Sequence, residues 1–157
     1  MKKYIGVKII EAKPMTRGEF SEYRGCRGWI PKNENPADEG YLVKYSDNYE
    51  SWSPKNVFDE VYRVCDNMTF GLAIEAMKKG KKVARKGWNG NNMFLYYVPV
   101  GAYKPCTEIA TSLVNENGLV EYGAYIAMKT AQGNVVPWLA SQTDMLAEDW
   151  VILDDSL

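Results

Sequence analysis

The chain has 157 residues, of which 46% are hydrophobic and 25% are charged, and its net charge is −1. These values are typical of one ordinary globular domain or two very small ones, so they exclude a large multidomain enzyme, a disordered chain and a fibrous protein. The sequence contains no histidine, which excludes triad hydrolases and histidine-ligated zinc sites. A net charge near zero also argues against duplex nucleic acid as a partner.

Aromatic residues make up 13% of the chain, and this favours recognition of a flat ring, because Trp and Tyr offer rigid stacking surfaces at a low entropic cost. Cys26, Cys65 and Cys106 are too far apart for a zinc knuckle or a dithiol site, and we expect them to be reduced and mostly buried. No apolar run approaches the roughly 18 residues of a membrane span, and no signal-peptide core follows Met1. We therefore expect a cytoplasmic protein with no membrane partner.

The first part of the chain predicts a small α+β module over residues 1–65. An interleaved apolar run predicts a strand over residues 3–12. Thr16 and Glu19 have the spacing of a capping box, which predicts a short helix that ends near Tyr23.

A hairpin and a second helix complete this module. We expect strands over residues 41–46 and 49–52 with a turn between them. Ser53 as N-cap and Pro54 in the first turn then predict a helix that runs through Val61.

After a short linker near Asp66, residues 68–157 predict an antiparallel sheet packed with one main helix. Thr69 caps this helix, which ends at Gly80. Strands are expected at Lys81–Lys86, Met93–Val98, Tyr125–Thr130, Val135–Trp138 and Trp150–Leu153. The chain as a whole is therefore expected to have an α+β fold.

Within this second part, the apolar strand Met93–Val98 should lie in the centre of the sheet. Trp150, Phe94 and Leu72 fall inside apolar periodic stretches, so we assign them to the core. A short helix is expected at Met145–Glu148.

The first candidate binding segment runs from Lys81 to Gly90, where basic and apolar residues alternate into an aromatic turn. Arg85 and Trp88 could clamp a phosphate beside a stacking surface. A tryptophan flanked by glycines is poorly placed for deep burial, and exposed tryptophans commonly anchor ligands. Alternatively, the neighbouring lysines only complement the C-terminal dipole of the preceding helix.

In the second candidate segment, Trp138 is followed by Ser141, Gln142 and Thr143. This combination suits a ligand ring that stacks on the indole and is read along its edge by hydrogen bonds. Alternatively, Ser141 or Thr143 caps the next helix and Asp144 lies in its first turn. The residues alone leave both interpretations open.

Three pieces of the chain resemble the phage family of Thoeris anti-defence proteins of the second type: MTFGLAIEAMKKGKKVARKGWNG, MFLYYVP and IAMKTAQGNVVPWLASQTDMLAEDW. The resemblance covers residues 68–153 and implies a phage protein that acts in the cytoplasm of an infected bacterial host. It implies a non-enzymatic sponge without cofactors, which sequesters glycocyclic ADP-ribose, a cyclic ADP-ribose isomer made as an immune signal, without cleaving it. Some members hold cyclic dinucleotides.

The resemblance also implies a homo-oligomer, a dimer or tetramer, with ligand sites at subunit junctions. It places Trp88 and Trp138 in the pocket and suggests four polar contacts, which are Asn89, Ser141, Gln142 and Asp144. Arg85 is a physical candidate for pairing with the pyrophosphate. Residues 1–67 depart from the family, whose minimal member lacks such an extension.

Other functions stay open at this level. An enzyme that destroys the signal would use carboxylates such as Asp144, Glu148 or Asp149, and it would need paired acids that face a pocket. Cyclic dinucleotides or oligonucleotides could replace the ADP-ribose isomer as the sequestered ligand. A structural or regulatory phage protein would instead use exposed aromatic residues to contact protein partners.

Overall fold

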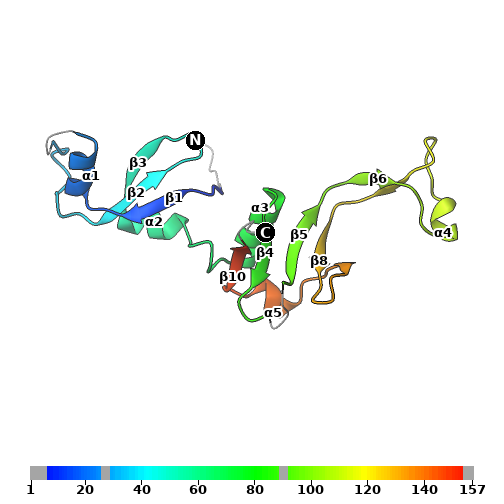
Figure 1. Ribbon diagram of the computed structural model, residues 1–157. Helices are drawn as coiled ribbons and strands as arrows, with labels where there is room; N and C mark the ends of the chain where they lie inside the picture. Colours follow the sequence, from blue (N-terminus) through cyan, green and yellow to red (C-terminus); the bar gives the residue numbers. More distant parts are fainter. Residues whose placement is uncertain (1–6, 26–28, 89–91, 154–157) are drawn as a thin grey trace. The chain divides into compact units, whose positions relative to one another are not determined.

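A computed structural model of the chain describes residues 7–25, 29–88 and 92–153 (Figure 1). The chain divides into two compact units, Met1–Arg63 and Val64–Leu157. Both units combine helices with antiparallel sheets, which confirms the α+β class. Among the described residues, no helix is long and apolar enough to cross a membrane.

The first unit has a three-stranded antiparallel sheet in the order β1-β2-β3. Its elements are β1 (Glu11–Pro14), α1 (Arg17–Tyr23), β2 (Gly40–Lys44), β3 (Glu50–Pro54) and α2 (Lys55–Val61). The capping box of Thr16 and Glu19 begins α1 as predicted. Helix α2 packs Phe58 on Tyr41, with 4.0 Å between the ring centroids. This aromatic contact between β2 and α2 holds the helix against the sheet.

Two predictions for this unit were wrong. The strand expected over residues 3–12 begins only at Glu11, because pairing with β2 starts at that residue, and residues 7–10 form no strand. Ser53 does not cap α2, since Ser53 and Pro54 complete β3 and Pro54 occupies the N-cap position without a side-chain hydrogen bond.

The second unit contains a five-stranded antiparallel sheet in the order β10-β4-β5-β8-β9. Its strands are β4 (Lys82–Arg85), β5 (Phe94–Val98), β8 (Tyr125–Lys129), β9 (Val135–Pro137) and β10 (Trp150–Leu153). Strand β5 lies in the centre, as its apolar sequence predicts. Helix α3 (Phe70–Lys78) has the predicted N-cap, since the Thr69 hydroxyl accepts a hydrogen bond from the amide of Leu72. Gly80 follows α3 at a φ of +81°, which only glycine adopts at little cost.

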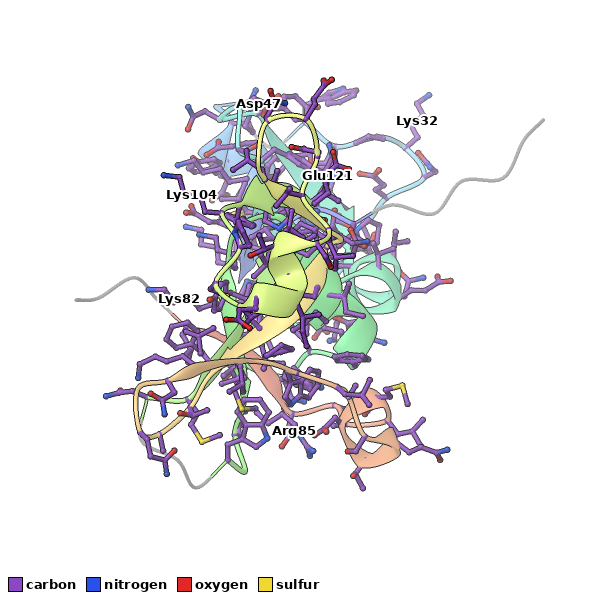
Figure 2. The ribbon with its side chains drawn as sticks, turned by 90° about the vertical axis from the view of Figure 1, so that its right-hand side faces the viewer. Lys32, Asp47, Lys82, Arg85, Lys104 and Glu121 are labelled. Atoms are coloured by element: carbon purple, nitrogen blue, oxygen red, sulfur yellow. The ribbon has the colours of Figure 1, made fainter. Side chains whose placement is uncertain are left out.

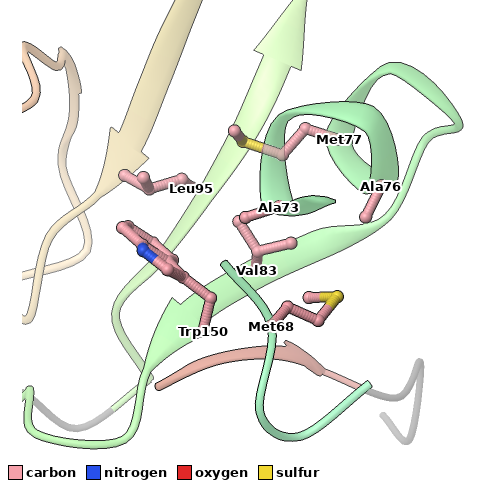
Figure 3. Close-up of a cluster of buried hydrophobic side chains, with 7 residues drawn as sticks. All are labelled: Met68, Ala73, Ala76, Met77, Val83, Leu95 and Trp150. Carbon is pink, nitrogen blue, oxygen red and sulfur yellow. The ribbon is translucent and has the colours of Figure 1, made fainter. Parts of the chain in front are cut away.

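Helix α3 packs on one face of this sheet and forms the main core with it (Figure 3). Trp150 and Leu95 are fully buried there, and Leu72 is partly buried against the same cluster. The assignment of Phe94 to this core was wrong. Side chains alternate along a strand, so Leu95 points to α3 and Phe94 to the opposite face, which we call the open face.

An additional hairpin interrupts the second unit between β5 and β8. It contains β6 (Gly101–Tyr103), α4 (Glu108–Thr111) and β7 (Val120–Tyr122), and β6 and β7 form a separate two-stranded sheet. The sequence did not predict these strands because three residues are too few to establish an alternating pattern. Cys106 in this hairpin and Cys65 are exposed, contrary to expectation, and Cys26 lies outside the described residues.

The alternation along β5 can be tested by truncating two neighbouring residues. Leu95→Ala should lower the free energy of unfolding by about 2 to 5 kcal/mol, because it leaves a cavity under α3. Phe94→Ala removes a larger side chain but should lower the free energy of unfolding by less, since this ring is only partly buried. Chemical denaturation of both variants checks this. A larger loss for Phe94→Ala would contradict the assignment of the two faces.

Candidate functional site

Three tryptophans that are distant in sequence meet at one end of the second unit. Trp88 follows β4, Trp138 follows β9 and Trp150 begins β10. Their ring centroids are 5.6 to 6.4 Å apart, with interplanar angles of 64° to 81°. These are edge-to-face contacts, which aromatic rings favour because the positive edge of one ring meets the negative face of another. Phe70 of α3 joins them, 5.3 Å from Trp150 and 6.0 Å from Trp138.

The members of this tryptophan cluster differ in burial. Trp150 is fully buried, and its indole N–H donates a hydrogen bond of 3.0 Å to the carbonyl oxygen of Asp144. Trp88 and Trp138 are only partly buried and pack against the core from outside. Trp150 therefore forms the base of the cluster, and the other two indoles keep part of their surface available to a ligand.

Beside the cluster lies the short helix α5 (Gln142–Met145), which starts three residues earlier than predicted. Ser141 and Asp144 form a capping box at its start. The Ser141 hydroxyl accepts from the Asp144 amide at 3.2 Å and donates to the Asp144 carboxylate at 2.6 Å. The interpretation of these two residues as a helix cap therefore describes their contacts in the structure.

Arg85, whose side chain is labelled in Figure 2, connects three segments of this region through its hydrogen bonds. Its Nε donates to Asp149 Oδ1 at 2.8 Å, and its Nη1 donates to Asp144 Oδ1 at 3.1 Å. A further contact of 3.4 Å joins Nη2 to Asp149 Oδ2. The guanidinium thus holds β4, α5 and the residue that precedes β10 together. It is already paired with two protein carboxylates rather than directed at an incoming phosphate.

These ion pairs change the titration of all three groups. Hydrogen bonds to Asp149 and Asp144 raise the pKa of Arg85. The hydrogen bond from Arg85 lowers the pKa of Asp149. Burial by itself would raise the pKa of Asp144, but hydrogen bonds from Ser141 and Arg85 outweigh it and lower that pKa. Both aspartates are therefore ionised near neutral pH, whereas a carboxyl group that serves as a general acid needs a raised pKa.

The structure brings together most of the residues that the sequence suggested. Arg85, Trp88, Trp138, Ser141 and Asp144 lie around the tryptophan cluster or are hydrogen-bonded to its neighbours. Gln142 is exposed at the start of α5, and its side chain makes no hydrogen bond among the described residues. Asn89 lies outside the described residues.

Sequence reasoning named Asp149 only as a carboxylate that an enzyme could use, and it missed both the pairing of Asp149 with Arg85 and the role of Trp150 as the base of the cluster. Asp149 precedes Trp150, which pairs with Arg85 in the register of β4 and β10. A prediction of that register could have placed Asp149 beside Arg85. No group of three acidic or cysteine side chains that could hold a metal ion occurs in the described part of the chain.

Comparison with known proteins assigns this region to a family. The sequence profile of the Thoeris anti-defense 2-like domain (Tad2-like) matches residues 68–153. Thoeris anti-defense 2 of Bacillus phage SP01 is 40% identical over 86 residues, which are 55% of this chain and 94% of that protein. The tryptophan cluster, α5 and Arg85 all fall inside the matched range, and the first unit lies outside it.

The Arg85 ion pairs predict a specific dependence of stability on pH. Because folding lowers the pKa of Asp149, this carboxylate stabilises the fold fully above its unfolded pKa of about 3.9, and the contribution is lost as the pH falls through the lower folded pKa. Asp149→Asn should therefore have a lower Tm near pH 7, and its Tm should fall less than that of the wild type between pH 7 and about pH 2.5. Parallel melting curves check this, and equal falls in Tm would contradict it.

Proposed function

The chain belongs to the Thoeris anti-defense 2-like family, and from this premise we propose that residues 68–153 bind a cyclic ADP-ribose isomer and sequester it without cleavage. In this proposal the ligand is glycocyclic ADP-ribose, an immune signal of the infected bacterial cell, and the protein acts in the host cytoplasm. A sponge needs a preformed site that binds tightly and contains no group poised to hydrolyse the ligand. Assembly into a dimer or tetramer belongs to the same proposal.

The observation that carries this proposal is the pair of partly exposed indoles, Trp88 and Trp138, supported by the buried Trp150. A purine ring that stacks on such a surface contributes about 1 to 3 kcal/mol to the free energy of binding. Because the Trp150 ring that supports the two outer indoles is fixed in the core, little side-chain entropy is lost when the ligand binds.

The polar residues divide into two roles in this proposal. Gln142 is exposed beside the cluster, so it is suited to read a ring edge through its amide. Asn89 stays a predicted contact. Ser141, Asp144 and Arg85 act indirectly, because their hydrogen bonds to one another hold α5 next to the indoles. The pyrophosphate contact first suggested for Arg85 would require it to leave an aspartate.

Two observations favour sequestration over hydrolysis. Asp144 and Asp149, two of the three acids that an enzyme could use, are paired with the same arginine and ionised. The Ser141 hydroxyl beside the cluster donates to Asp144, but this carboxylate is paired with Arg85 and has a lowered pKa, so it is a poor base for activating a nucleophile. A cyclic dinucleotide could stack on the same indoles, so it is the second candidate ligand.

Incubation of the full chain with glycocyclic ADP-ribose, followed by heat denaturation and chromatography, tests the proposal. We expect the intact ligand to be released in an amount that matches the protein. Recovery of a cleaved product would show an enzyme. Failure to retain either this nucleotide or any cyclic dinucleotide would favour a protein whose aromatic residues contact other proteins.

The two outer tryptophans should contribute directly to affinity. Trp88→Ala and Trp138→Ala should each weaken binding by about 1 to 3 kcal/mol, or one to two decades in Kd, through loss of stacking. Calorimetric titration measures this, and melting curves identify any loss of folded protein. Trp29→Ala is the matched control, because Trp29 is 68% exposed in the first unit and should leave affinity unchanged. Normal affinity and normal melting in both cluster variants would place the site elsewhere.

A further inference from the structure

Three tyrosines meet at the turn between β2 and β3 of the first unit. The amide of Tyr45 donates a hydrogen bond of 2.9 Å to the carbonyl oxygen of Tyr49, and their rings stack with centroids 5.8 Å apart. Tyr62, which follows α2, is hydrogen-bonded to Tyr45 through its side chain. We call these three residues the tyrosine cluster. Tyr49 is 63% exposed, so the cluster presents a ring to solvent as well as packing against α2.

The cluster already holds a cation from its own chain. The ammonium group of Lys8 lies 5.1 Å from the centroid of the Tyr45 ring, a distance at which the face of the ring attracts a positive charge. Lys8 belongs to residues 7–10, which form no helix or strand, and Val7 and Ile9 on either side of it are 37% and 38% exposed. A side-chain contact, in place of sheet pairing, therefore brings this segment to the cluster.

The charges around the cluster also suit a cation. Asp47 lies in the turn itself, and its carboxylate accepts a hydrogen bond of 3.0 Å from the amide of Tyr49 (Figure 2). Arg63 directs its guanidinium to the carbonyl oxygens of Asp59 and Tyr62 at the end of α2. Because side chains alternate along a strand, the charged residues of the three-stranded sheet point to the face opposite α2. These residues are Glu11, Lys13, Lys44 and Glu50.

Residues 7–10 can leave the cluster without loss of the fold. An exposed cation–π contact is weak, and the described helices and strands of the unit begin only at Glu11. A segment of the same chain competes at a high effective concentration, so a segment from outside has to gain a contact that residues 7–10 leave unused. Tyr49 offers this contact, because its ring stays mostly exposed while Lys8 is in place.

We propose that the tyrosine cluster receives a lysine side chain from a segment of another protein, and that Lys8 occupies the cluster in the free chain until that segment displaces it. Apolar residues flank Lys8 on both sides, so the partner segment is expected to carry its lysine between apolar residues as well. The inference is independent of nucleotide binding, since the first unit lies outside the range of the family match.

Fluorescence anisotropy of the full chain with a labelled peptide tests the inference. The probe is a fluorescein-labelled peptide with the sequence of residues 6–11, GVKIIE, and a second probe has uncharged norleucine in place of the lysine. Lys8→Ala should bind the lysine peptide about fivefold more tightly than the wild type, because the lysine of the chain no longer competes. The same variant should bind the norleucine peptide about fivefold more weakly than the lysine peptide. Equal affinity of the two proteins or of the two peptides, or absence of binding, would overturn the inference.

Substitution of the rings in the Lys8→Ala chain locates the site. Tyr45→Leu and Tyr49→Leu should each weaken binding of the lysine peptide about fivefold, because leucine has no aromatic face. Tyr45→Phe keeps the ring and should retain the affinity. Tyr23→Leu is the matched control, because Tyr23 is also exposed and has the ammonium of Lys13 5.8 Å from its ring, but on the opposite face of the sheet. It should leave the affinity unchanged.

Melting curves of the same variants distinguish loss of the site from loss of the fold. Tyr49→Leu is the decisive variant, since replacement of an exposed side chain leaves the chain folded. A folded Tyr49→Leu chain that binds the lysine peptide as tightly as its Lys8→Ala parent would overturn the inference. Equal weakening by Tyr23→Leu would overturn it as well, because the effect would then not belong to the tyrosine cluster.

Discussion

Burial of the Trp150 indole is the constraint on which the second unit depends. Trp150 starts β10, pairs with Arg85 of β4, and exchanges backbone hydrogen bonds of 2.8 and 3.2 Å with Met68, just before α3. Its ring fills the space below α3, and its N–H binds the carbonyl oxygen of Asp144. Through its backbone and its indole together, this one residue connects the main helix, two strands and α5. Because a buried indole requires a partner for its N–H, α5 has to stay where Asp144 can supply the acceptor.

The ion pairs around Arg85 follow from this arrangement. The register that sets Trp150 opposite Arg85 also brings Asp149 within reach of the guanidinium, while the indole hydrogen bond keeps Asp144 nearby. Two carboxylates and one arginine leave a net negative charge beside the indoles. An anionic ligand would be repelled by these carboxylates, so it has to direct its phosphates away from them and its rings toward the tryptophans. This favours stacking, rather than charge pairing, as the main source of affinity.

Local signals in the sequence predicted most of the regular structure, because each acts over a few residues. Thr69 and Gly80 delimit α3, and the capping box at Thr16 begins α1. Features that depend on strand pairing were harder to predict. The apolar run of β5 identifies a central strand but cannot say whether Phe94 or Leu95 faces α3, and the contact of Arg85 with Asp149 exists only in one register. The capping box at Ser141 was visible in the sequence, yet the expected helix was placed three residues too late.

The alternation of side chains also places two different sets of residues on the two faces of one sheet. Arg85, Trp150 and Ile152 point to the face that carries α3 and the tryptophan cluster, whereas Lys82 and Phe94 point to the open face. A shift of one residue in the pairing of β4 would exchange these sets and bury a lysine under α3, so the fold itself keeps them apart. The side chains of the open face can therefore be substituted without disturbing the indoles.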